Sequence, residues 1–228
     1  MANASFSQVM GSIQGAFDSV LQPKGFQAHE YTYNRGMEDG LIQVVDIQLY
    51  PSKLPYPGWE KYRARFTINL GVYVPEVGEH YSATLAQTPW VKESGLVVAP
   101  LEPWVLDIQC ALRERIGHVS EDAKDIWWPL REDEMIIEDA LYYLQTYGIP
   151  FVEHWSSRDR ILENWDENTA RGMNLAPNVV KAIILSERGD MESARVLLAE
   201  HVHELDSPDS EHFFRRLAKR LGIWRLDG

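Results

Sequence analysis

Polar residues that could form a binding surface alternate with apolar residues along three stretches of the chain. Arginine can hold a carboxylate or phosphate through two parallel hydrogen bonds, and carboxylates and amides can bind other polar groups. Successive side chains of a strand point to opposite faces, so we expect the polar residues to share one face of a sheet. These residues are Asp46, Gln48, Arg63, Arg65, Thr67, Asn69, Asp107, Gln109 and Arg113.

Three interpretations of this polar face remain open. It is a solvated surface held by charge pairs such as Asp46–Arg63, a binding face for a protein or peptide, or a pocket for a small polar ligand. Neighbouring strands lie about 5 Å apart, so the groups would form a continuous field. Gly71 extends this field, because a glycine lets another backbone come close.

The strand that must position these groups is the clearest element of the sequence. Thirteen residues alternate between apolar and polar from Tyr62 to Val74, which predicts a strand with one face on a core. A hairpin precedes it, from Tyr31 through the turn at Asp39-Gly40 to a second strand over Leu41 to Tyr50. Alternation between Trp104 and Leu112 predicts a fourth strand.

Helical patterns flank the predicted strands. Residues 6–21 repeat apolar side chains at three- and four-residue spacing, which predicts an N-terminal helix ending near Pro23 and Gly25. Residues 75–103 have no clear period, and we expect at most a short helix at 82–86. Five later helices are predicted, over 134–147, 157–164, 177–188, 190–202 and 211–221.

This order predicts an α+β fold with an N-terminal helix, about four antiparallel strands and a helical C-terminal half. We expect an α+β domain over residues 1–170 and a small helical subdomain over 171–228, packed on it.

Motifs of common catalytic and cofactor sites are missing from the sequence. There is no phosphate-binding loop, dinucleotide fingerprint, nucleophile elbow or paired-histidine zinc helix. Cys110, the single cysteine, falls on the apolar side of its predicted strand and is expected to be a small buried hydrophobe. We therefore predict no catalytic residues, no cofactor and no metal site.

Charge and composition limit the choice of partners. The 228 residues carry a net charge of −12, which repels nucleic acid and anionic membranes. One cysteine, no apolar run of 18 residues and no basic segment before an apolar block near residue 1 predict a cytoplasmic protein outside the membrane. Trp59 and Trp90 lie in proline-rich stretches, where we expect exposed anchors of an interface.

Five separated segments resemble the DUF4304 family of bacterial proteins. They cover residues 20–26, 41–48, 66–73, 110–117 and 125–130. The resemblance implies a small cytosolic bacterial protein and carries over no catalytic residue. Some such families lie beside toxins as immunity proteins.

The leading hypothesis is a non-enzymatic module that binds another protein. Its most concrete form is an immunity- or antitoxin-like protein whose acidic surface blocks a basic partner, such as a basic toxin, sterically. The rival hypothesis is an enzyme or small-ligand protein that uses the polar face of the sheet.

Overall fold

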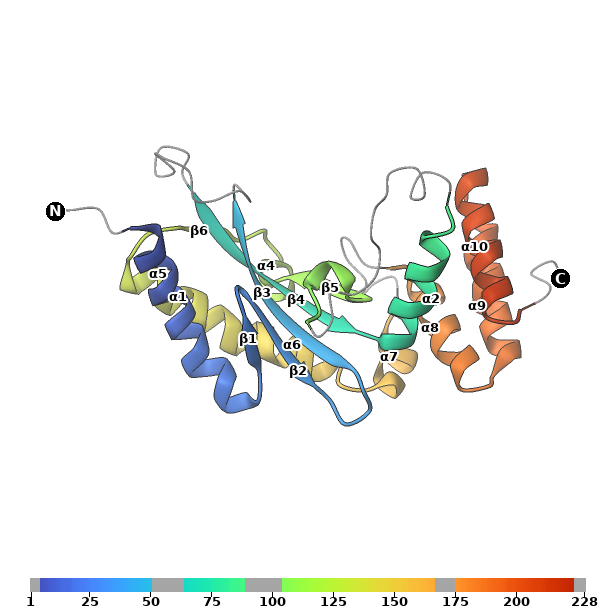
Figure 1. Cartoon of the computed structure of the whole chain (residues 1–228), viewed down its shortest axis with the longest axis horizontal. Coiled ribbons are helices and arrows are strands. Elements are labelled where there is room, and N and C mark those ends of the chain that lie inside the picture. The colour runs from blue at the N-terminus through green and yellow to red at the C-terminus, as the bar shows by residue number, and fades with distance from the viewer. Residues whose placement is uncertain (1–4, 51–63, 89–103, 167–174, 224–228) are drawn as a thin grey trace.

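The computed structural model describes residues 5–50, 64–88, 104–166 and 175–223 of the chain. Its order of elements confirms the α+β class: a first helix, an antiparallel sheet and a helical C-terminal half (Figure 1). Helix α1 covers Phe6–Leu21, as predicted, and Ser5 caps it by accepting a hydrogen bond from the Gln8 backbone.

Within the described residues the sheet has six strands, two more than expected, and all of their pairs are antiparallel. Strands β1 to β5 follow one another in space as they do in sequence, and β6 pairs with the first residues of β4, Arg65 and Phe66. Their bounds are β1 (Gln27–His29), β2 (Thr32–Gly36), β3 (Ile42–Tyr50), β4 (Arg65–Tyr73), β5 (Leu112–Arg115) and β6 (Trp128–Pro129).

Period-two patterning fixes the register of the two long strands. In β4, Phe66, Ile68 and Leu70 are fully buried on the face that packs against α1. The predicted hairpin turn is confirmed: Gly40 has a φ of 85°, and the Met37 backbone donates to the Leu41 carbonyl.

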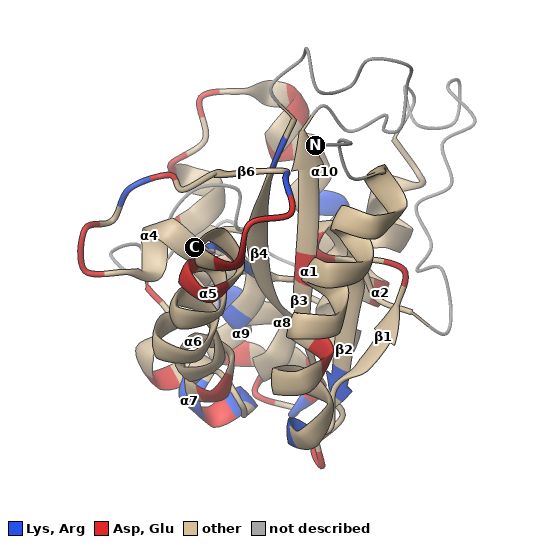
Figure 2. Ribbon diagram, turned by 90° about the vertical axis from the view of Figure 1, so that its left-hand side faces the viewer, with Lys and Arg blue, Asp and Glu red and all other residues tan. Residues whose placement is uncertain are grey.

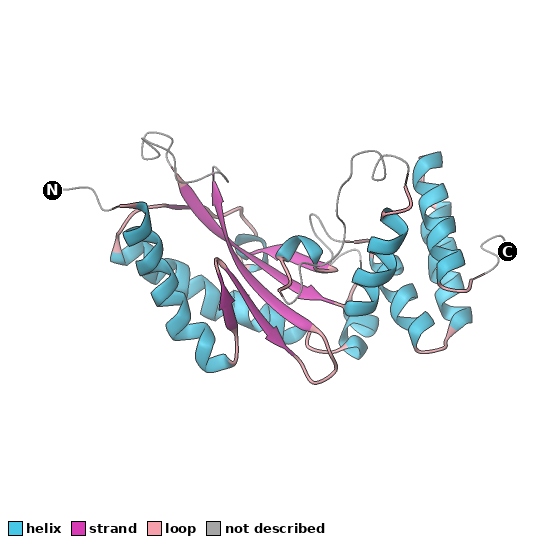
Figure 3. Ribbon diagram, viewed as in Figure 1, coloured by secondary structure: helices cyan, strands magenta, loops and turns pink. Residues whose placement is uncertain are grey.

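Two groups of helices surround the sheet, as Figures 1 and 3 show. The first group lies along one face together with α1 and shares its apolar core. It consists of α4 (Ile116–Val119), α5 (Glu134–Tyr143), the π-helical turn η4 (Leu144–Gly148) and α6 (Ile149–His154). The last three of these correspond to the helix predicted over 134–147 and extend it.

A second core lies at the other end of the sheet. It joins Val72 and Leu112 of the sheet to Val180, Leu198 and other apolar residues of the C-terminal helices. The helices of this end are α2 (Pro75–Leu85), α7 (Arg158–Asn164), α8 (Pro177–Glu187), α9 (Met191–His203) and α10 (Pro208–Arg220). The subdomain boundary at residue 170 falls outside the described residues and stays a prediction.

The strand predicted over Trp104 to Leu112 is wrong for most of its length. Residues 107–109 form a 3₁₀ turn, η3 (Asp107–Gln109), and only Leu112–Arg115 pair with β4. The Gln109 side chain accepts a hydrogen bond from the Leu106 backbone and thereby closes the turn on itself. Helix α2 is also longer than the predicted segment at 82–86, since Pro75 starts it.

None of the described helices combines the length and the apolar character needed to cross a membrane.

Candidate functional site

The polar residues of β3 and β4 do lie on one face of the sheet. Asp46 is opposite Asn69, and Gln48 is opposite Thr67. The Asn69 amide donates to the Gln48 side chain at 3.1 Å, and the Thr32 hydroxyl donates to Asp46 at 2.7 Å. The structure therefore brings these predicted residues together. Asp46, Gln48 and Asn69 are hydrogen-bonded to neighbouring side chains, whereas the buried Thr67 hydroxyl has no hydrogen-bond partner among the described residues.

A segment of the chain itself covers part of this face. Val105 and Cys110 are buried against Val44 and Tyr73, so the segment with η3 lies over the sheet. Gly71 makes this possible, because a Cβ atom there would lie 2.5 Å from the Cys110 Sγ atom. The close approach at Gly71 is thus to the chain's own cysteine.

Asp107 and Arg113 meet under this cover. An Arg113 Nη2 atom donates to Asp107 Oδ2 at 2.7 Å, and both side chains are mostly buried. Burial and the charge of Asp107 raise the pKa of Asp46 to about 6, against the lowering effects of Thr32, Asn69 and Arg113. Asp46 therefore changes its charge near pH 6, inside a set of groups that already bind each other.

The open end of the same face carries what we call the arginine–aromatic cluster: Tyr50, Arg65, Arg115 and Trp127. The Arg65 guanidinium lies 4.9 Å from the ring centre of Tyr50 and 5.0 Å from that of Trp127. The Arg115 guanidinium lies 5.0 Å from the same Trp127 ring. Two cations and two rings are therefore stacked together at the surface.

Asp125 holds one half of this cluster in place. Its carboxylate accepts hydrogen bonds from Arg115 at 2.8 Å and from the Trp127 indole at 2.9 Å. Burial opposes ionisation of Asp125, but these two hydrogen bonds outweigh it and lower its pKa. Among the described residues, Arg65 has no such carboxylate partner, and its side chain is exposed.

Three of the predicted residues lie outside the described ranges. They are Arg63, Trp59 and Trp90.

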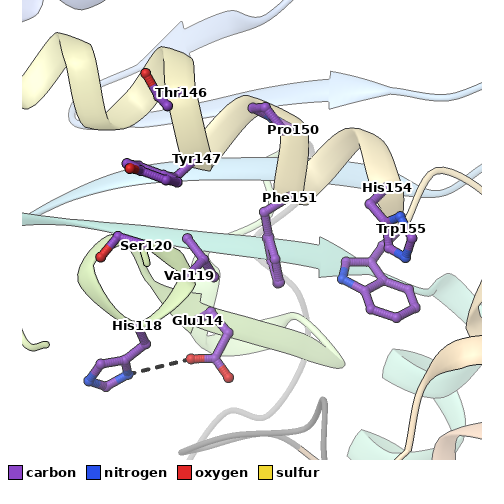
Figure 4. Close-up of a pocket in the computed structure, with 10 residues that line it drawn as sticks. All are labelled: Glu114, His118, Val119, Ser120, Thr146, Tyr147, Pro150, Phe151, His154 and Trp155. Carbon is purple, nitrogen blue, oxygen red and sulfur yellow. Dashed lines mark ion pairs between the residues drawn. The ribbon is translucent and has the colours of Figure 1, made fainter. Parts of the chain in front are cut away.

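A cavity of about 520 Å³ lies elsewhere, between the helix formed by η4 and α6 and the segment formed by β5 and α4. Figure 4 shows Tyr147 and Phe151 extending from the helix toward Glu114 and His118 on the opposite side. Trp155 closes one end. The cavity thus has aromatic walls on the helix side and ionisable groups on the sheet side.

Glu114 is the single carboxylate among the residues that line the cavity. It is opposite Leu70 in the sheet, so it lies on the core-facing side of β5, and only 4 % of its side chain is exposed. A carboxylate in such a place is costly unless polar or charged groups contact it. One contact is with His118, whose Nδ1 atom lies 3.5 Å from Glu114 Oε2.

The π-helical turn shapes the opposite wall. Pro150 has no N–H group, so the Thr146 carbonyl loses its α-helical donor, and both residues line the cavity. The Ile149 backbone instead donates to the Leu144 carbonyl, five residues back. Such turns widen a helix locally and occur often at functional sites.

Close packing fixes both walls of the cavity. A Cβ atom at Gly148 would lie 2.8 Å from Ile116, and one at Gly117 would lie 1.9 Å from the Lys124 carbonyl oxygen. The Trp155 ring meets the Trp165 ring edge to face, with 5.2 Å between the ring centres. The cavity is therefore bounded by elements that have little room to shift.

This cavity was not predicted from the sequence, although one signal was present. Glu114 falls on the same parity as the apolar Leu112 and Ile116, so its side chain is directed to the core. No group of three or more His, Cys, Asp and Glu residues in the described ranges is placed to hold a metal ion.

The fold and its sites define an α+β protein with one helix-covered sheet face, a charged and aromatic surface on the other face, and a cavity beside the edge strand. Residues 17–154 match the model of a protein family described as a domain of unknown function, DUF4304. The match covers more than half of the chain, and the chain belongs to this family, as its resemblance suggested. No curated protein and no solved structure matches the chain.

Proposed function

We propose that this chain is a non-enzymatic, cytoplasmic module that binds another protein through the arginine–aromatic cluster. The observation that carries the proposal is the stacking of Arg65 and Arg115 on Trp127, beside the half-exposed Tyr50. Tryptophan, tyrosine and arginine are the residues that contribute most to binding energy in protein interfaces. Asp125 orders Arg115 and Trp127 in advance, so little entropy would be lost on binding.

The charge of the chain supports a basic partner. The net charge is −12, and Figure 2 shows acidic residues on the turn after α4 and at the start of α5. Such a field would speed the approach of a basic protein, while the local positive charge of the cluster would fix its orientation. An immunity- or antitoxin-like protein that blocks a basic toxin sterically is the most concrete form of this proposal.

The first test is capture of partners from a lysate of the source organism by the tagged chain, at low and at high salt. A captured protein is then purified and its affinity measured by calorimetry. We expect Trp127→Ala to weaken binding by about 2 kcal/mol or more, as at an interface hot spot. Arg65→Ala should weaken it by about 1 kcal/mol or more.

Arg195→Ala is the matched control, because it removes the same charge from α9, where Arg195 pairs with Glu192 at 2.7 Å. Its affinity should stay within about twofold of the wild type. Failure to capture any protein at either salt concentration, or equal weakening by Arg65→Ala and Arg195→Ala, would contradict the proposal.

The rival hypothesis, a small polar ligand on the sheet face, has less support. Asp46, Gln48 and Asn69 are hydrogen-bonded to their neighbours, and the segment with η3 covers part of the face. A metabolite screen for a raised melting temperature, repeated with Asn69→Ala, tests it.

A further inference from the structure

We infer that the arginine–aromatic cluster holds the carboxylate of an aspartate or glutamate side chain on the partner protein, with the Arg65 guanidinium as the group that contacts it. This inference rests on the proposed function, because it names the chemical group that the same surface would bind.

The charges around Trp127 carry the first step of the argument. Arg65 and Arg115 each lie 5.0 Å from the centre of its ring, and Asp125 accepts a hydrogen bond from its indole. Both oxygens of Asp125 also accept hydrogen bonds from Arg115, at 2.8 Å and 2.9 Å. Two cations therefore share one carboxylate, and that carboxylate is bound to Arg115 and not to Arg65.

Two aromatic rings fix the position of the Arg65 guanidinium. The Tyr50 and Trp127 rings meet edge to face, with 6.0 Å between their centres and 69° between their planes, and the guanidinium lies over both. A guanidinium stacks through its planar face, whereas its N–H groups point outward in that plane, so stacking leaves them free to donate. Their spacing matches the two oxygens of a carboxylate. A cation that is already held in place loses little freedom when it binds.

Neighbouring arginines show the pairing that Arg65 lacks. Arg113 pairs with Asp107 at 2.7 Å, and Arg131, just after β6, pairs with Asp133 at 2.8 Å. No carboxylate in the described parts of the chain is paired with the exposed Arg65, so the missing partner would come from another molecule. Such a pair contributes little in open water, but an interface that excludes water strengthens it.

The overall charge of the chain selects the kind of anion. The net charge is −12, and acidic residues lie on the turn after α4 and at the start of α5 (Figure 2). A polyanion such as nucleic acid would bring many negative charges into this field and would be repelled. A single carboxylate on an otherwise basic protein meets Arg65 without that repulsion.

Heteronuclear NMR of the full chain tests the inference, because the Trp127 indole N–H and the Arg65 Nε–H report on the site directly. The probes are two hexapeptides with blocked ends, one alternating glutamate with glycine and the other alternating glutamine with glycine. We expect the glutamate peptide to shift both signals and to bind at least about fivefold more tightly than the glutamine peptide.

Arg65→Gln should weaken binding of the glutamate peptide about fivefold and leave the glutamine peptide unchanged. Arg65→Lys keeps the charge without the planar set of donors, and its affinity should lie between those of the wild type and Arg65→Gln. Arg195→Gln is the matched control, because it removes the same charge from α9, and it should stay within about twofold of the wild type. The same spectra show whether each variant is folded.

Equal affinity for the two peptides, or unchanged affinity of folded Arg65→Gln for the glutamate peptide, would overturn the inference. Tighter binding of a thymidine hexanucleotide at the same two signals would also overturn it, because it would indicate a site for phosphate groups.

The peptide experiment separates this inference from the proposed function. If the glutamate peptide does not bind but Trp127→Ala still weakens a captured protein, the inference is wrong and the proposed function stands. If the glutamate peptide binds at Arg65 and no protein is captured, the carboxylate site is supported and the proposed function is wrong.

Discussion

The charged residues on the two faces of the sheet have different surroundings. On the face opposite α1, Asp107 is paired with Arg113 and Asp125 with Arg115, so most charges are balanced at short distance. On the face toward α1, most side chains are apolar, apart from the hydrogen-bonded Arg35 and Gln43, and Glu114 lies on the edge strand beside aromatic rings. The first face resembles a structural network with an exposed end, whereas the second contains a buried carboxylate, in contact with His118, beside a cavity.

This difference shows where binding energy is available. Polar groups that already bind each other gain little from a ligand, because each new hydrogen bond replaces an existing one. The groups that remain for recognition are Arg65 at the exposed end of the polar face and the aromatic rings of the cavity. Measurements of stability on the two faces test this contrast.

The largest effect is expected at Gly117, on the cavity side. An alanine Cβ there would meet the Lys124 carbonyl oxygen at 1.9 Å, and a backbone atom cannot move away without shifting the turn. We expect Gly117→Ala to lower the free energy of unfolding by about 3 kcal/mol, measured by urea denaturation.

Two other glycines provide the comparison. Gly71→Ala on the polar face would meet the Cys110 Sγ atom at 2.5 Å and the Cys110 Cβ atom at 2.8 Å, so the segment with η3 must shift slightly, and the change should cost about 1–2 kcal/mol. Gly11→Ala has no atom within 4 Å outside the helix and should stabilise α1 by up to about 1 kcal/mol. A larger loss at Gly71 than at Gly117 would show that the cover with η3 is the more rigid of the two contacts.

Asp46 should make the stability of the polar face depend on pH. Its pKa is about 6 in the folded chain and about 4 in the unfolded chain, so the folded state takes up a proton first as the pH falls. Relative to Asp46→Asn, the wild type should therefore gain about 2–3 kcal/mol of stability between pH 7.5 and pH 4. Urea unfolding at several pH values measures this; parallel curves for the two proteins would refute it.

Arg65→Ala should change stability least. The side chain is exposed and stacks on Tyr50 and Trp127 without a carboxylate partner in the described parts of the chain. We expect a change in the free energy of unfolding of less than about 0.5 kcal/mol, although the same variant should weaken partner binding. A loss of more than about 1 kcal/mol would make Arg65 a structural residue.

Much of the fold could be predicted because apolar residues recur at regular spacing in its main helices and strands. Strand β4 alternates over its whole described length, and α1 carries an unbroken apolar stripe. The prediction failed over Trp104 to Cys110, because apolar alternation also fits a segment that crosses a sheet without pairing to it. Helix α2 was mostly missed, since Gly78 and Thr84 interrupt its pattern.

The polar face could be predicted in part, and the cavity could not. Strand periodicity placed Asp46, Gln48 and Asn69 together, but it did not show that they bind each other. The cavity combines Glu114 from β5 with Trp155 after α6, and only tertiary packing makes them neighbours. The π-helical turn that shapes the helix wall also changes the periodicity that sequence patterns depend on.

The π-helical turn at Leu144–Gly148 sets the rotation of α6 relative to α5. An α-helix advances about 100° per residue, so one extra residue in the turn points every later side chain in a different direction. Phe151 and Trp155 line the cavity because of this offset. Pro150 favours the offset by removing one N–H donor, so the direction of a whole wall of the cavity depends on the local geometry of this one turn.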